Sequence, residues 1–273
     1  MRPVGFFSSL STTSLRSKNG RRHGAPEQGN GAERADAERA DAERAAADAA
    51  TDPGPGAGSD ATLVLVEIDR MFVQVFALVG EAIAGATHSL LACDRDAAKQ
   101  LMARDDVVDE RIAAITALTQ RELVTGETTA QQRRELVTVL RMLPDLDRNG
   151  DLAAHIARRA ARGLGAEMSP RSRGLVERMG EVAAGIWAST ADAFAERSVH
   201  AASLVDALDD ELDELHVGFS AELATGAMPV PVAIELAMVA RFYERFGDHA
   251  VNLARRMAAL ASGGPDPGGA GAD

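Results

Sequence analysis

Acidic side chains recur four residues apart at four places in this chain. The pairs are Asp105 and Asp109, Asp147 and Asp151, Asp209 and Asp213, and Glu244 and Asp248. On a helix this spacing puts both carboxylates on one face, about one turn apart, where their repulsion costs roughly 0.2–0.5 kcal/mol. Two such helices facing each other offer up to eight carboxylate oxygens, which suit iron or hard divalent cations. The pattern therefore predicts a bound cation or a compensating basic side chain.

A second interpretation of these pairs stays open. The chain has 41 acidic residues, so many such pairs arise by accident, and any single pair is more often a solvated helix face. Arg148 and Arg245 lie inside two of the pairs and offer neutralisation without a metal. We keep them, with Asp106 and Asp210, as secondary site candidates. The metal hypothesis depends on the placement of the pairs, which recur at matching positions of an internal repeat.

The two halves of the chain form an internal sequence repeat. Residues 105–110, 122–126 and 147–153 match residues 209–214, 222–226 and 244–250 in the same order. Duplication of one unit explains this order better than chance. Gly150 and Gly247 occupy equivalent places inside strongly helical segments, where glycine costs about 1 kcal/mol relative to alanine. We expect them to allow a close helix approach or to leave room for a ligand.

Apolar residues at helical spacing predict the elements that position these side chains. Gly126 is a predicted helix end, and Ser169 followed by Pro170 is a predicted helix start. No segment reads as a strand, so the predicted fold is all-α, with two tandem three-helix bundles. The six expected helices cover residues 62–91, 95–125, 129–163, 170–196, 199–225 and 231–261. The expected units are a tail and linker at 1–61, bundles at 62–165 and 168–262, and a tail at 263–273.

Composition narrows the function classes. The formal net charge of −12 argues against nucleic acid or an anionic membrane as the main partner. No apolar run is long enough to span a membrane, so we expect no membrane insertion. Cys93 is the only cysteine, which excludes an intramolecular disulfide and suits a cytoplasmic location. The basic, serine-rich residues 1–24 resemble a transit peptide, and a charged repeat follows at about 32–46.

Residues 140–157 and 241–254 resemble the paired signature of the PhoU family. The second copy reads Glu244-Arg245-Phe246-Gly247-Asp248, followed by His249-Ala250-Val251-Asn252-Leu253-Ala254. The first copy departs from the signature at Asn149, where a hydrophobic residue is expected, and at Pro144. The resemblance covers about residues 62–261, and its doubled motif makes it specific.

The resemblance implies a cytoplasmic homodimer that is a regulatory adaptor and not an enzyme. It implies negative regulation of phosphate uptake and starvation signalling, between the ATPase subunit of a phosphate ABC transporter and a sensor histidine kinase. Some members of the family bind multinuclear iron or other metal clusters through these carboxylates. The resemblance therefore leaves two expectations open for this chain: multinuclear iron or another divalent metal (Fe, Mn, Mg or Zn), or no metal.

Two alternatives remain. The first is a carboxylate-bridged di-iron protein of the ferritin-like class, which requires Glu-x-x-His on two helices. The helical region contains no such motif, and the nearest match is Asp213 with His216. The other alternative is a metal-free helical scaffold. We expect His155, His216 and His249, like Trp187 and Tyr243, to be packing or surface residues rather than ligands.

Overall fold

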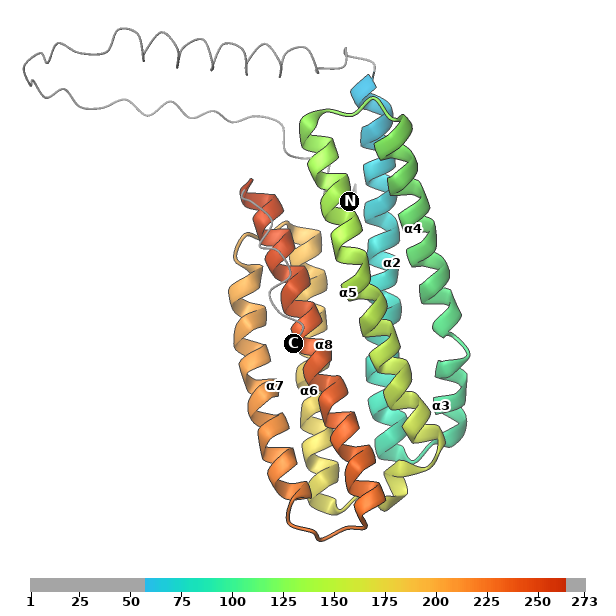
Figure 1. Ribbon diagram of the computed structural model, residues 1–273, viewed down its shortest axis with the longest axis vertical. Coiled ribbons are helices and arrows are strands. Elements are labelled where there is room, and N and C mark those ends of the chain that lie inside the picture. The colour runs from blue at the N-terminus through green and yellow to red at the C-terminus, as the bar shows by residue number, and fades with distance from the viewer. Residues whose placement is uncertain (1–56, 264–273) are drawn as a thin grey trace, which may run out of the picture.

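The computed structural model describes residues 57–263, and over this range the chain forms helices without any strand (Figure 1). The six long helices are α2 Ala57–Ala92, α4 Asp105–Thr125, α5 Ala130–Ala161, α6 Pro170–Glu196, α7 Ala201–Leu223 and α8 Val230–Ser262; the short elements are α3 Arg95–Met102 and η1 Leu164–Glu167. The all-α class with six long helices is confirmed. The interpretations of residues 1–56 and 264–273 lie outside the described residues.

Local capping chemistry explains several helix ends. The Ser169 hydroxyl accepts a hydrogen bond from the Ser172 backbone N–H at 3.0 Å, and Pro170 is the first residue of α6, as predicted. Thr129 and Gln132 form a reciprocal capping box at the start of α5. Gly126 is the C-cap of α4, which confirms that prediction as well.

Two helix boundaries differ from the predicted ones by more than two residues. The helix expected over residues 95–125 is divided into α3 and α4 by a turn at Ala103 and Arg104. The acidic pair Asp105 and Asp106 follows directly, and carboxylates are more favourable in the first turn of a helix than in its middle. In addition, α2 begins at Ala57 rather than at about residue 62.

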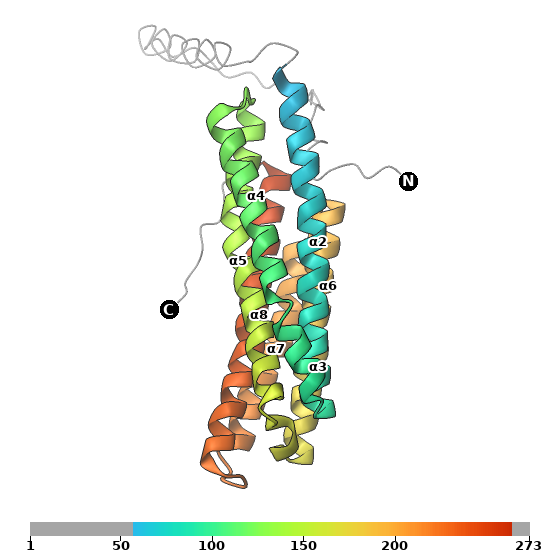
Figure 2. The ribbon, with the colours of Figure 1, turned by 90° about the vertical axis from the view of Figure 1, so that its right-hand side faces the viewer.

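Helices α2, α5, α6 and α8 form the centre of the molecule. Among them, α2 packs on α5 and α6, and α8 packs on the same two helices. Helix α4 covers α2 and α5 on one side, and α7 covers α6 and α8 on the other (Figures 1 and 2). The two three-helix bundles therefore share one hydrophobic core instead of standing as separate units.

Aromatic side chains fill the seam between the bundles. Phe72 of α2 stacks on Phe194 of α6, with ring centroids 5.2 Å apart. Trp187 of α6 donates its indole N–H to the Phe76 carbonyl oxygen at 2.8 Å and lies 5.2 Å from the Phe246 ring. Tyr243 is fully buried, and its hydroxyl lies 2.7 Å from the Thr87 hydroxyl. Trp187 and Tyr243 are therefore packing residues, as expected.

Polar contacts also cross the seam. The Asn149 side-chain amide donates to the Phe246 carbonyl oxygen at 3.2 Å, so the departure from the hydrophobic pattern at residue 149 joins the bundles. His249 Nδ1 lies 3.0 Å from Asp145 Oδ1, and both side chains are buried. No helix in the range 57–263 combines the length and the apolar character needed to cross a membrane.

A buried charge cluster lies where α2, α5 and the end of α6 meet. Glu135 is 1% exposed, and Gln131 donates a hydrogen bond to its Oε1 at 2.9 Å. Burial raises the pKa of Glu135 to about 7, while the Gln131 hydrogen bond and the charge of Arg197 oppose this rise. Arg197 also faces the buried Asp69, with Nη2 3.7 Å from Oδ2. Two carboxyl groups thus share one guanidinium in a low-dielectric site.

We predict that the stability of the protein falls with rising pH through Glu135. In the unfolded chain this carboxyl titrates near pH 4.3, so between about pH 4 and 7 the folded state holds a proton that the unfolded state releases. The resulting stabilisation is complete below about pH 4 and is lost by about pH 7. Glu135→Gln should therefore gain stability relative to the parent protein as pH rises from 5 to 8.

The measurement is urea unfolding of both proteins at pH 5 and pH 8. Glu127, which is exposed near the start of α5, provides the control Glu127→Gln. A Glu135→Gln difference that stays constant with pH would contradict the prediction.

Candidate metal centre: two facing acidic helix pairs

The second-copy carboxylates meet between α7 and α8. Asp209 and Asp213 lie on α7, and Glu244 and Asp248 lie on α8, which packs along α7. Asp213 is exposed, and the other three are partly buried. The structure brings all four into one electrostatic cluster, because the charges of Asp213, Asp248 and Glu244 all act on Asp209.

Burial and repulsion raise the pKa values of three carboxyl groups in this cluster. The pKa of Asp209 rises to about 7, first through burial and then through the charges of Asp213 and Asp248. The pKa of Asp213 rises through burial and the charge of Asp248. The pKa of Glu244 rises through burial and again the charge of Asp248. The carboxylates are thus held closer together than their mutual repulsion favours, and a cation would relieve this cost.

Arg241 is the basic partner that the sequence analysis missed. It donates a hydrogen bond to Glu244 Oε1 from one turn earlier on α8, and its charge lowers the pKa of Glu244. Arg245 has the same influence on Glu244 but a weaker one. The spacing of three residues between Arg241 and Glu244 is a recognisable helix ion-pair signal. One carboxyl oxygen of the cluster is therefore already neutralised within the chain.

Two other oxygens of the cluster remain without partners. Asp209 Oδ1 and Glu244 Oε2 are buried, and neither has a hydrogen-bond partner among the described residues. A buried acceptor without a donor costs about 1–3 kcal/mol. An all-oxygen donor set with unmet acceptors fits a hard cation. Among residues 57–263, however, no three His, Cys, Asp or Glu side chains converge closely enough to hold a metal ion.

The motif glycines mark equivalent contacts in the two copies. A Cβ on Gly247 would overlap Asp209 Oδ1 and lie 3.0 Å from Leu212 Cδ2. A Cβ on Gly150 would lie 3.3 Å from Val108 Cγ1. Val108 occupies in the first repeat the place that Leu212 occupies in the second, so the internal duplication is visible in the packing. Gly247 lets α8 approach α7 closely enough to bury Asp209.

The carboxylates of the first repeat are more exposed than those of the second. Burial raises the pKa of Asp147, with added repulsion from Asp151 and Asp109, while Arg148 lowers it. Asp109 and Asp151 are exposed, so only Asp147 of these three is partly buried. The side chain of Asp105 lies outside the described residues, although its backbone begins α4. The structure thus brings Asp109, Asp147 and Asp151 together and leaves Asp105 as a prediction.

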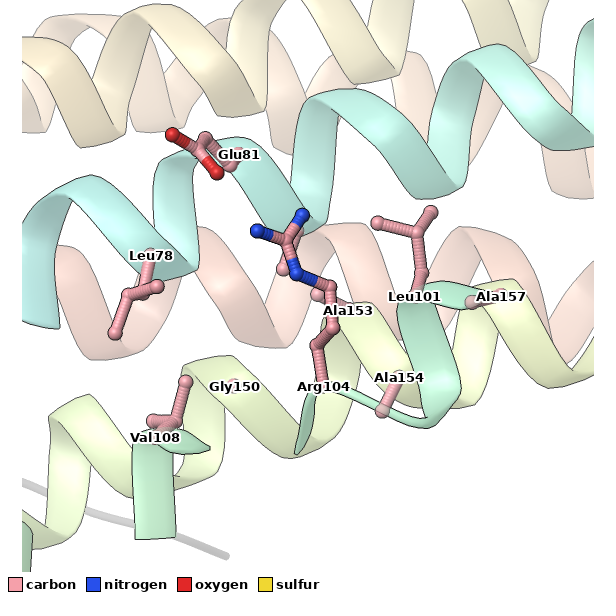
Figure 3. A pocket seen from close by; sticks show the side chains of 10 residues that line it. Leu78, Glu81, Leu101, Arg104, Val108, Gly150, Ala153, Ala154 and Ala157 are labelled. Carbon is pink, nitrogen blue, oxygen red and sulfur yellow. The ribbon is translucent and has the colours of Figure 1, made fainter. Parts of the chain in front are cut away.

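A small cavity lies beside the first glycine, at the break between α3 and α4. Figure 3 shows Val108 next to Gly150, with Leu101 and Arg104 flanking the break. The cavity measures about 30 Å³ and is lined mainly by apolar groups from α2, α3, α4 and α5. Its lining has only one carboxylate, Glu81, together with the basic Arg104, so the cavity does not suit a cluster of cations.

The secondary site candidates and the histidines contribute little to the acidic clusters. Asp106 and Asp210 are exposed, and Asp210 acts on the cluster only by raising the pKa of Asp213. His216 lies beside Asp213 and Arg241, and burial followed by the Arg241 charge lowers its pKa. His155 packs against the Phe242 ring at 5.2 Å. His249 pairs with Asp145 in the seam instead of facing the acidic cluster.

We predict that Gly247→Ala destabilises the protein by about 1–3 kcal/mol, because the new methyl group overpacks against Asp209 and Leu212. Gly185 of α6 has open space at its Cβ position, so Gly185→Ala should instead gain up to about 1 kcal/mol of helix propensity. Both are measured by urea unfolding in EDTA. In an Asp209→Ala background the cost of Gly247→Ala should shrink; an unchanged cost would contradict the assigned contact.

Comparisons with known proteins agree with this architecture. The family described as PhoU domain matches residues 72–160 and again residues 176–257, so both repeats are matched. The phosphate-specific transport system accessory protein PhoU homolog 1 of Mycobacterium tuberculosis (strain ATCC 25618 / H37Rv) is 32% identical over 209 residues, covering 73% of this chain and 91% of the relative. The PhoU homolog of Rhizobium meliloti is 27% identical over 206 residues, covering 74% and 86%.

Solved structures of PhoU proteins have the same fold as this chain. The crystal structure of PhoU from Pseudomonas aeruginosa superimposes with a TM-score of 0.69 at 27% identity, covering 74% of this chain and 98% of that one. The phosphate transport system regulatory protein PhoU from Streptococcus pneumoniae shares the fold, with a TM-score of 0.64 at 21% identity and coverage of 72% and 94%. Because the family model matches both repeats, this chain belongs to the PhoU family.

Proposed function

We propose that this protein is a regulatory adaptor of phosphate homeostasis that restrains phosphate uptake and starvation signalling. It acts between the ATPase subunit of a phosphate ABC transporter and a sensor histidine kinase. The observation that carries this proposal is the match of both repeats to the PhoU domain. The names of the relatives, which describe accessory proteins of a phosphate-specific transport system, support the pathway.

We also propose that the acidic helix pairs bind a divalent cation or iron as an input to this adaptor. Asp209, Asp213, Glu244 and Asp248 would hold it in the second copy, and Asp105, Asp109, Asp147 and Asp151 in the first. The metal supplies positive charge that lowers the repulsion between facing helices. The unpaired oxygens of Asp209 and Glu244 and the raised pKa values support the second copy as the tighter site.

Within this proposal the chain itself does the positioning. Gly247 brings α8 onto α7, and Arg241 holds one Glu244 oxygen in place. Without a cation, Asp209 keeps a proton up to about pH 7, which limits the local negative charge. Binding and release of a cation would therefore change both the charge of this edge and the force between α7 and α8. A docking surface that changes in this way needs no catalytic centre.

Metal content provides the first test. We expect Glu244→Ala with Asp248→Ala to bind less manganese or iron than the parent protein, because oxygen ligands are lost. The metal is quantified after dialysis of the full chain against each ion. Glu177 and Glu181 form an exposed acidic pair with the same spacing on α6, so their double alanine variant is the matched control. Equal losses in both variants would show that surface charge, not a site, determines binding.

Gene deletion provides the test of regulation. Removing this protein should raise expression of phosphate-uptake genes in phosphate-rich medium, and expression of the full chain should restore repression. The Glu244→Ala and Asp248→Ala double variant is then expressed in the deletion strain. If it restores repression although it no longer binds metal, the adaptor role does not depend on the cation. Unchanged expression in a strain without a second copy would contradict the regulatory role and favour the metal-free scaffold.

A further inference from the structure

An arginine-lined groove lies between the first half of α5 and the end of α8. We call it the arginine groove. Its volume is about 420 Å³, and it is lined by Ala130, Gln131, Arg133, Arg134, Val137, Thr138, Arg141, Arg256, Ala259, Leu260 and Gly263. It lies on the seam between the bundles, and none of the acidic-cluster residues lines it. The metal proposal does not use it.

The charge of the groove is opposite to that of the protein. Four arginines line it, and no acidic residue is among its lining residues, although the chain as a whole has a net charge of −12. The first turn of α5 also faces the groove through Ala130 and Gln131, and a helix N-terminus carries partial positive charge. Such a concentration of guanidinium groups is maintained against self-repulsion, which an anion would relieve.

The arginines are spaced along the groove, not gathered at one point. Arg134, Val137, Thr138 and Arg141 follow one another along a single face of α5, at intervals of three and four residues. Arg134 and Arg141 are therefore roughly 10 Å apart along the helix axis, at about 1.5 Å per residue. Val137 and Leu260 place apolar surface in the groove. This spacing along the helix favours an elongated ligand over a compact one.

Arg256 forms the buried end of the charged set. Its side chain is only 13% exposed, and its Nη1 donates to the Arg141 carbonyl oxygen at 3.0 Å and lies 3.5 Å from Asp145 Oδ2. Its Nε is buried without a hydrogen-bond partner among the described residues. Asp145 and the Arg141 carbonyl therefore fix this guanidinium at the wall of the groove.

We propose that the arginine groove binds an elongated anion with two or more linked phosphoryl groups, such as a short inorganic polyphosphate or a nucleoside triphosphate. Guanidinium groups bind phosphoryl oxygens through paired, charge-assisted hydrogen bonds. The volume falls within the range of small-molecule sites. A single orthophosphate would reach one end of the groove only. This inference is independent of the proposed adaptor role, so either can fail alone.

Calorimetric titration of the full chain in EDTA tests the proposal, with tripolyphosphate, ATP and orthophosphate as probes. We expect tripolyphosphate or ATP to bind at least about tenfold more tightly than orthophosphate, and more weakly as sodium chloride is raised. The ratio between ATP and tripolyphosphate distinguishes a nucleotide from an inorganic chain. Equal binding of orthophosphate and tripolyphosphate, or no binding at millimolar concentration, would overturn the proposal.

Matched variants locate the binding. Arg134→Ser with Arg141→Ser removes two exposed groove arginines and should lower affinity at least about tenfold. Arg111→Ser with Arg121→Ser removes two exposed arginines of α4 and should leave affinity within about twofold. Thermal melting checks that both variants fold. A similar loss in both variants would overturn the proposal, because it would show attraction to overall charge.

The charged repeat at residues 32–46, which has five acidic residues and three arginines, is the competing occupant. Replacing its five acidic residues by Asn or Gln in the full chain removes every carboxylate of the segment; they are Glu33, Asp36, Glu38, Asp41 and Glu43. We expect probe affinity to stay within about threefold. Binding that appears only after this replacement would assign the groove to the chain's own acidic segment and would overturn the small-anion proposal.

Discussion

The packing of α2 and α5 against α6 and α8 is the interaction on which the rest of the structure depends. Burying a large apolar side chain contributes about 1.5–3 kcal/mol, and the seam buries Phe72, Phe194, Trp187 and Phe246 together. Repulsion between facing carboxylates at the outer edges acts against folding. Because the apolar seam supplies stability at the centre, the edges are free to carry groups that are unfavourable for folding.

This division explains how charge is distributed. The carboxylate clusters lie between outer and central helices, at α4/α5 and α7/α8, on opposite sides of the molecule. The arginine groove lies on the seam itself, between α5 and α8. Each charged region thus depends on a different pair of helices. Both α5 and α8 belong to an acidic edge and to the groove, so these two helices connect all three regions.

Much of the fold could be predicted because its signals are local or repeated. Helical spacing, the Ser169 cap and the order of the duplicated acidic motifs are all readable in the linear sequence. Arg241 was readable too, since it lies three residues before Glu244, a spacing at which oppositely charged side chains pair on a helix. The burial of Asp209 depends on the approach that Gly247 allows, and only the glycine's presence was visible.

The remaining features arise from contacts between distant segments. Glu135 faces Arg197, and His249 faces Asp145, through side chains that no sequence period links. The arginine groove combines residues of α5 and α8 that are more than a hundred positions apart. The break at Ala103 and Arg104 was missed because both residues are compatible with a helix interior, and the acidic residues that follow it were interpreted as ligands alone.

The position of Trp187 has a practical consequence for spectroscopy. It is the only tryptophan in the chain, it is buried in the seam, and its indole N–H is bonded to the backbone of the other bundle. Indole emission depends on the polarity around the ring, and every other part of the chain is silent at the tryptophan excitation edge. The protein therefore carries an intrinsic fluorophore at the contact between its two halves. Any event that separates or tightens that contact can be followed in real time without a label.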